Sequence, residues 1–175
     1  TSAKAFNDRA LFYKFMFSPY IIDKEKKYYR FFSYAFIHAD WSHLFFNMFT
    51  LFFFGPYVEK AFYSFWNAFG ILVFVILFFA ATAISSLSDF YKYRNNSYYS
   101  AVGASGAISA VLFSYILINS LGKIYLFFIP IGIPAFIFGI IYLLISAYFA
   151  RKGNDNIGHN AHFWGAVFGF IFPIL

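Results

Sequence analysis

The sequence predicts an all-α membrane protein with several spans. Hydrophobic residues make up 62% of the 175 residues and charged residues only 11%, which lies well outside the composition of soluble domains. A soluble core of this length could not hide 30 Phe and 15 Tyr, whereas a bilayer solvates such side chains directly. Several apolar runs also approach the roughly 20 residues that a helix needs to cross the hydrocarbon.

Five apolar segments are predicted to span the membrane, and together they form one domain over residues 1–175. We expect the first to end near Tyr57, because Pro in Gly55-Pro56 cannot donate a backbone hydrogen bond and the charged pair Glu59-Lys60 follows. The fourth contains Pro130 and Pro134, which bilayer helices tolerate when neighbours satisfy the freed carbonyls. The expected spans are residues 42–57, 66–87, 103–120, 124–150 and 160–175.

Residues 1–41 are too charged to span a bilayer and too aromatic to be fully solvated. This combination predicts an interfacial segment whose basic side chains lie at the level of the lipid headgroups. The side chains concerned are Lys14, Lys24, Lys26, Lys27 and Arg30. We therefore expect the partner of this positive charge (net +6) to be the headgroups of a lipid bilayer. No nucleic-acid binding is predicted.

The chain contains no cysteine. This excludes a disulfide framework, a thiolate nucleophile and a zinc site with sulfur ligands.

Three polar clusters lie at the beginnings of the first, third and fifth expected spans: His43 with Asn47, Ser105, and His159-Asn160 with His162. Alternate helices of an antiparallel series begin on the same side of the membrane, so all three clusters should lie at one shallow depth. Ionisable groups within a bilayer are costly and usually mark function. We therefore expect these residues to form one functional layer.

The helices that carry Ser105 and His162 are expected to pack closely. His162, Gly165 and Gly169 share a helix face, and the two glycines form a GxxxG surface. The helix of Ser105 has a similarly small surface, made by Ala101, Ala104, Ala107 and Ala110. Contact between the two surfaces would bring His162 to Ser105.

Ser105 lies between Gly103 and Gly106, and such a run is by itself more often a packing surface than a catalytic motif. The presence of the other polar clusters beside Ser105 favours a catalytic role. A serine nucleophile needs a base, for which His162 is the candidate. His43, the Asn47 amide and the Ser105 backbone N–H could stabilise an oxyanion. Asp155 is interpreted as a solvated loop charge, so the arrangement predicts a Ser–His dyad.

Metal binding is the competing use of these histidines. His43, His159 and His162 could be ligands, with Asp40 and His38 close to His43 in sequence. Neither an HExxH motif nor paired carboxylates accompany them, so no metal and no cofactor are predicted. His38 is expected to fix the loop that precedes the first span.

These motifs resemble those of the rhomboid intramembrane serine proteases. The family pattern has an HxxxN pair, a GxSG serine and an AHxxGxxxG helix. The chain contains "HLFFN" (residues 43–47), "GASG" (103–106) and "AHFWGAVFG" (161–169), in that order. The segment "YYRFFSYAFIHADWSH" is similar to the family's first loop. A Trp-Arg pair is common in that loop, and this chain has Tyr29-Arg30 at the corresponding place. The sequence "VEK" (58–60) also falls where the family often has it. The similarity extends from Tyr28 to the C-terminus.

The resemblance implies that Ser105 is the nucleophile and His162 the general base, with His43 and Asn47 lining the oxyanion hole. Gly103, Gly106, Gly165 and Gly169 would give structural support. The reaction would be cofactor-free hydrolysis of a peptide bond in or near a transmembrane segment of a membrane protein. Substrates would carry small or helix-breaking residues near the cleaved bond.

The alternative is a catalytically inactive rhomboid-like protein that binds or escorts membrane helices. Such relatives usually lack the serine or the histidine, and this chain has both. A plain helical scaffold would leave the polar layer unexplained.

Two departures from the family pattern stand out. The resemblance implies six core helices, and the first is expected to be absent or to lie upstream of residue 1. Some bacterial members also have a tyrosine one turn after the serine that packs against the catalytic histidine. Ser109 stands at that place here, so His162 is expected to be held differently.

The orientation of the site is predicted in two opposite ways. The expected catalytic side carries all Lys and Arg residues except Lys60 and Lys123, and the positive-inside rule would place that side in the cytoplasm. The resemblance implies that the catalytic side faces the outside of a bacterial plasma membrane. We favour this orientation because a first helix and its flanks usually dominate orientation. The sequence gives no signal for an oligomeric state.

Overall fold

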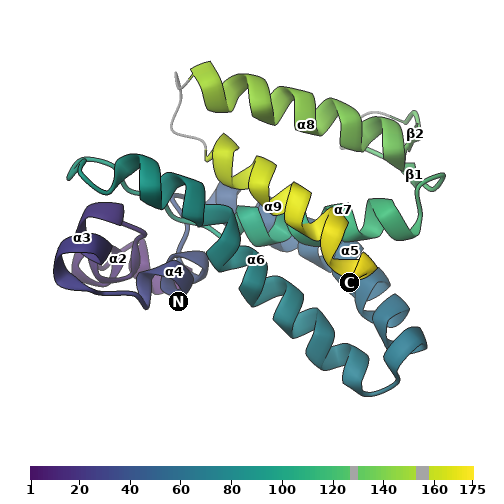
Figure 1. Cartoon of the computed structure of the whole chain (residues 1–175), viewed down its shortest axis with the longest axis horizontal. Helices are drawn as coiled ribbons and strands as arrows, with labels where there is room; N and C mark the ends of the chain where they lie inside the picture. The colour runs from purple at the N-terminus through teal and green to yellow at the C-terminus, as the bar shows by residue number, and fades with distance from the viewer. Residues whose placement is uncertain (127–129, 153–157) are drawn as a thin grey trace.

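The computed structural model describes residues 1–126, 130–152 and 158–175, and it is predominantly helical (Figure 1). Short helices form the N-terminal region, long helices form the rest, and one pair of two-residue strands precedes α8. The elements are α1 (Ser2–Ala5), α2 (Arg9–Phe15), α3 (Pro19–Glu25), α4 (Arg30–Ser33), η1 (Tyr34–Phe36), α5 (Trp41–Trp66), α6 (Phe69–Tyr93), α7 (Ser105–Ile118), β1 (Lys123–Ile124), β2 (Ile133–Pro134), α8 (Ala135–Lys152), α9 (His159–Ile171) and η2 (Phe172–Ile174).

Helix α7 is the central helix of the bundle. It contacts α5, α6, α8 and α9, and every residue from Gly106 to Ile116 is buried. A helix that is apolar on all sides and only 14 residues long is typical of a core helix surrounded by others. The bundle therefore holds the beginning of α7, where Ser105 lies, in a fixed place.

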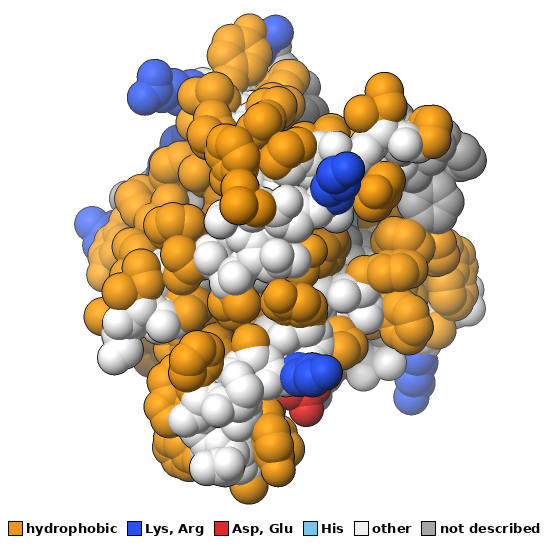
Figure 2. All heavy atoms as spheres, turned by 90° about the vertical axis from the view of Figure 1, so that its right-hand side faces the viewer, with side chains coloured by type: hydrophobic (Ala, Val, Ile, Leu, Met, Phe, Trp, Pro, Cys, Tyr) orange, Lys and Arg blue, Asp and Glu red, His pale blue; other side chains and the backbone are white. Residues whose placement is uncertain are grey.

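The outer helices expose large apolar side chains. Phe52 on α5 is 73% exposed and Leu144 on α8 is 66% exposed. Figure 2 shows one end of the molecule, where hydrophobic side chains cover most of the surface and charged side chains are few. Among the described residues, α6 and α8 are long and apolar enough to cross a membrane. These features fit a membrane bundle, and the number of spans stays a prediction.

The first expected span is wrong at its end. Helix α5 continues through Pro56 and ends at Trp66 rather than near Tyr57. Pro removes a single backbone hydrogen bond, and the rest of a long helix can tolerate that loss.

The fourth expected span is wrong at its beginning. Helix α8 begins at Ala135, because Lys123–Ile124 pair in antiparallel fashion with Ile133–Pro134. Pro130 and Pro134 therefore precede the helix, and residues 127–129 of the expected span lie outside the described residues. The other spans begin within three residues of the expected places, and α6 extends beyond its expected end, to Tyr93.

The N-terminal region forms its own small core against the bundle. Phe17, Ile22 and Tyr34 are buried there and pack against Phe90 of α6 and Tyr99.

The interfacial role expected for Arg30 is wrong, since the residue is only 4% exposed. Its Nη1 donates to the carbonyl oxygens of Tyr13 at 2.9 Å and Met16 at 2.6 Å. The guanidinium therefore closes the end of α2 instead of reaching lipid headgroups.

The segment between α6 and α7 is anchored to this N-terminal region. Phe17 and Ala101 exchange two backbone hydrogen bonds, of 2.9 and 3.0 Å, and the Gly103 N–H donates to the Tyr34 carbonyl at 2.9 Å. The residues immediately before Ser105 are therefore held on both sides.

Candidate active site

The three polar clusters line one cavity of about 1030 Å³. His43 and Asn47 come from α5, Ser105 from α7 and His162 from α9. Residues of α6 and of the segment before α7 complete its wall. The structure thus brings together residues that are far apart in the chain.

Ser105 is the first residue of α7, directly after a turn that requires glycine. Gly103 has a φ of +106°, and a Cβ there would collide with the imidazole ring of His43. A Cβ on Gly106 would run into the side chain of Ser85. Both glycines therefore permit close approach of the α7 N-terminus to α5 and α6.

Helices α7 and α9 are in backbone contact, as the small residues of both helices predict. A Cβ on Gly165 would overlap the carbonyl oxygen of Gly106, and one on Gly169 would overlap that of Ala110. The Ser114 hydroxyl also donates to the Gly169 carbonyl at 2.8 Å. This contact places the beginning of α9, with His162, beside the beginning of α7.

Asn47 offers a buried amide to the cavity. The residue is 5% exposed, and its Nδ2 has no hydrogen-bond partner among the described residues. An unpaired buried donor is costly, so this group is available to a ligand atom in the cavity.

Asp40 and His38 have structural partners of their own. The Asp40 carboxylate caps α5 by accepting from the His43 N–H at 2.7 Å. The Ser2 hydroxyl donates to the Phe36 carbonyl at 3.0 Å and lies 2.9 Å from His38 Nδ1, so Nδ1 donates to the hydroxyl oxygen. Burial lowers the pKa of His38 to about 4. The neutral imidazole thus fixes α1 to the loop before α5, as expected.

His43, His159 and His162 line one cavity, but the described residues of the metal hypothesis do not form a metal-binding group. His159 stacks on Phe149, with 5.1 Å between ring centroids. Within the described ranges, no group of three or more His, Asp or Glu side chains is arranged to hold a metal ion. Asp155 lies outside the described residues.

A tyrosine from α8 that the sequence did not single out lies beside His162. The Ser109 hydroxyl donates to the Ser105 carbonyl at 2.8 Å and lies 2.6 Å from the Tyr142 hydroxyl, which therefore donates to Ser109. The Tyr142 ring lies 6.5 Å from the His162 ring, at an interplanar angle of 34°. The only sequence signal was a polar aromatic residue inside an apolar span.

Asp89 near the end of α6 was also missed, and it is a buried carboxylate on the cavity wall. Its two oxygens accept from Asn160 Nδ2 at 2.6 Å and from the Tyr99 hydroxyl at 2.8 Å. Burial, and then the Asp89 charge, raise the pKa of Tyr99 far above its usual range. The signal available from sequence was a lone acid at the end of an otherwise apolar span.

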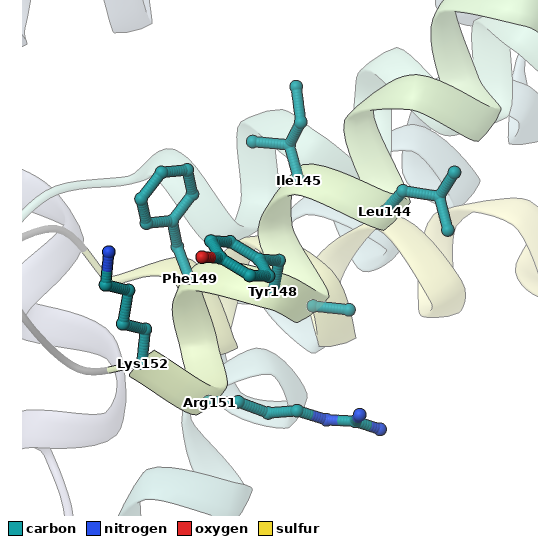
Figure 3. Close-up of a pocket in the computed structure, with 7 residues that line it drawn as sticks. Leu144, Ile145, Tyr148, Phe149, Arg151 and Lys152 are labelled. Carbon is teal, nitrogen blue, oxygen red and sulfur yellow. The ribbon is translucent and has the colours of Figure 1, made fainter.

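A second hollow, of about 880 Å³, lies along the end of α8. Figure 3 shows its lining side chains, which come from α8 alone and spread apart along the helix. They include Arg151 and Lys152 but no group that could serve as nucleophile or base near neutral pH, so the site is assigned to the other cavity.

The family model for the rhomboid domain matches residues 25–175. The chain belongs to the rhomboid family. It is also similar to RHOMBOID-like protein 12, mitochondrial, of Arabidopsis thaliana, with 33% identity over 144 residues, which cover 76% of this chain. The match spans 42% of that relative's length.

Membership of the rhomboid family identifies the chain as a membrane protein of a family that includes serine proteases. The bacterial plasma membrane expected from the sequence finds no support in the plant relative, whose name places it in the mitochondrion.

Proposed function

We propose that this rhomboid protein is an intramembrane serine endopeptidase that uses Ser105 and His162 as a catalytic dyad. One observation carries the proposal. Ser105 and His162 line the same cavity, on two helices whose backbones touch, together with a buried amide that has no partner among the described residues.

In the proposed reaction the Ser105 hydroxyl oxygen attacks the carbonyl carbon of the scissile peptide bond while His162 accepts the hydroxyl proton. The tetrahedral intermediate collapses, the C–N bond breaks, and His162 donates the proton to the leaving amine. Water then hydrolyses the acyl-enzyme with His162 as base, which releases the carboxylate product and restores Ser105.

The oxyanion would be stabilised by donors at the same cavity. Asn47 supplies its unpaired amide, and His43 lies one turn earlier on the same face of α5. Ser105 contributes its backbone N–H, since the first N–H groups of a helix have no partner within the helix and the dipole favours negative charge there. Such preorganised donors contribute on the order of 10²–10³-fold each to kcat.

The substrates proposed are transmembrane segments of other membrane proteins. A peptide in a regular helix has its carbonyl groups hydrogen-bonded and its backbone shielded by side chains. Small or helix-breaking residues near the cleaved bond would let the backbone unwind into the cavity.

Reaction of the detergent-solubilised protein with a fluorophosphonate probe tests the nucleophile. We expect the wild type to be labelled and Ser105→Ala not to be labelled, while the matched variant Ser64→Ala, at an exposed position of α5, keeps full labelling. His162→Ala should greatly slow labelling. Folded wild-type protein that is neither labelled nor cleaves a model transmembrane substrate would instead support the inactive, helix-binding alternative.

A further inference from the structure

Asp89 is a buried carboxylate. Within the described part of the chain it is held in place by hydrogen bonds and not by an ion pair. It is 4% exposed, and the ion pairs among the described residues are Lys24–Asp23 and Lys27–Glu25. A buried carboxylate is unfavourable unless hydrogen bonds replace its hydration. The two short bonds from Asn160 and Tyr99 supply that replacement, and both are charge-assisted.

The two donors come from the elements that carry the reacting pair. Asn160 is in the first turn of α9, two residues before His162. Tyr99 belongs to the segment that leads into Ser105, and its ring stacks on Tyr93 of α6 with 3.9 Å between centroids. A single carboxylate therefore joins α6 to the approaches of both Ser105 and His162.

The charge also suits its position. The N-terminal turn of a helix has unsatisfied N–H groups and a partial positive charge, which favour a nearby anion. Asp89 binds the first turn of α9 through Asn160. The hydrogen bond from Asn160 joins α9 to α6, whereas the Gly106–Gly165 contact joins α9 to α7, so the two restraints fix α9 to different helices.

We propose that Asp89 is a positioning residue of the active site, which holds the first turn of α9 and the segment before α7 at the separation that the dyad needs. This role rests on the proposed function, but the restraint itself is independent of catalysis. Displacement of reacting groups by about 1 Å can cost on the order of 10²-fold in rate.

The test exchanges the two partners. In Asp89→Asn the carboxylate charge is lost and the new amide offers one acceptor oxygen to two donors, so Asn160 or Tyr99 must reorient its polar group. In Asn160→Asp two carboxylates face each other. The double variant Asp89→Asn/Asn160→Asp satisfies every group again, because the new amide on α6 accepts from Tyr99 through its oxygen and donates through its NH₂ to the new carboxylate on α9. Asp23→Asn, at a solvent-accessible carboxylate on α3, is the matched control.

Four quantities are measured for each variant: kcat and KM for a model transmembrane substrate, the melting temperature, and hydrogen exchange of residues 158–163 and 95–104. We expect each single variant to lower kcat about 10- to 100-fold with little change in KM and to accelerate exchange in both segments. The double variant should restore kcat and exchange, and Asp23→Asn should resemble the wild type.

Each possible result counts for or against the role of Asp89. Wild-type kcat and exchange in the single variants, or a double variant that restores only the melting temperature, would overturn it. If the wild type itself is inactive, the proposed function fails, and the exchange measurements still decide whether Asp89 restrains the two segments.

Discussion

The hydroxyl groups of Ser109 and Tyr142 lie 2.6 Å apart and join α7 to α8 one turn below Ser105. Ser109 donates to the Ser105 carbonyl, so Tyr142 is linked to the first residue of α7 through one hydroxyl. The same tyrosine ring lies beside His162. A side chain from α8 thus lies beside His162, whereas the resemblance implies that in some bacterial members a tyrosine on the serine helix does so.

Tyr142→Phe should therefore impair catalysis more than folding. Loss of one neutral hydrogen bond of about 1 kcal/mol corresponds to a decrease of about fivefold in kcat, if the bond orders the dyad. Ser109→Ala should have a similar effect, and the double variant should be no worse than either single variant, because both remove the same link. The control is Tyr148→Phe, because Tyr148 is an exposed tyrosine of α8. Additive effects of Tyr142→Phe and Ser109→Ala on kcat would contradict the link.

Gly165→Ala should destabilise the α7–α9 contact. The added Cβ meets the Gly106 carbonyl, which is backbone and cannot rotate away. We expect a loss of about 1–3 kcal/mol in the free energy of unfolding and slower labelling of Ser105 by a fluorophosphonate, and Gly165→Leu should abolish activity. In Gly139→Ala the Cβ meets only side chains, Ile116 at 3.3 Å and Phe113 at 3.5 Å, so that control should be nearly neutral. Wild-type labelling of Gly165→Leu would refute the packing argument.

Asn47→Ala should separate activity from stability. The amide Nδ2 has no partner among the described residues, so its removal costs little or no folding energy, whereas the loss of an oxyanion donor should lower kcat by about 10²–10³-fold. The reverse is expected for Asn119→Ala at the far end of α7, where Nδ2 donates to the Tyr115 hydroxyl at 3.1 Å. Thermal unfolding and kcat are measured for both. Equal losses of activity would remove Asn47 from the oxyanion hole.

His38 should make stability depend on pH. Its pKa is lowered from 6.5 to about 4 in the folded protein, chiefly by burial, so the unfolded chain binds the proton more readily. The stabilisation is complete above about pH 6.5 and is lost as the pH falls towards 4. Melting temperatures across this window should fall more steeply for the wild type than for His38→Asn, whose side chain does not titrate. Parallel curves would show that the pKa of His38 is the same in the folded and the unfolded protein.

Much of this protein could be predicted from the sequence because membrane helices and active-site motifs are local signals. Apolar runs predict the long helices, and a GxxxG face with an alanine face predicts the contact between α7 and α9. The order of polar clusters along alternate helices predicts that His43, Ser105 and His162 meet in one layer. Each of these inferences depends on periodicity or composition within single segments, or on the order of those segments along the chain.

Tertiary structure decided what depends on partners distant in the chain. Whether α5 ends at Pro56 or passes through it depends on its packing, and whether residues 123–134 join α8 depends on the pairing of β1 with β2. The sequence around Arg30 is the same whether its side chain reaches a lipid headgroup or is buried. Its burial is explained by the carbonyl oxygens of Tyr13 and Met16, which accept its hydrogen bonds. Asp89 and Tyr142 acquire roles only through Asn160, Tyr99 and Ser109, because a hydrogen bond between elements leaves no pattern in either segment alone.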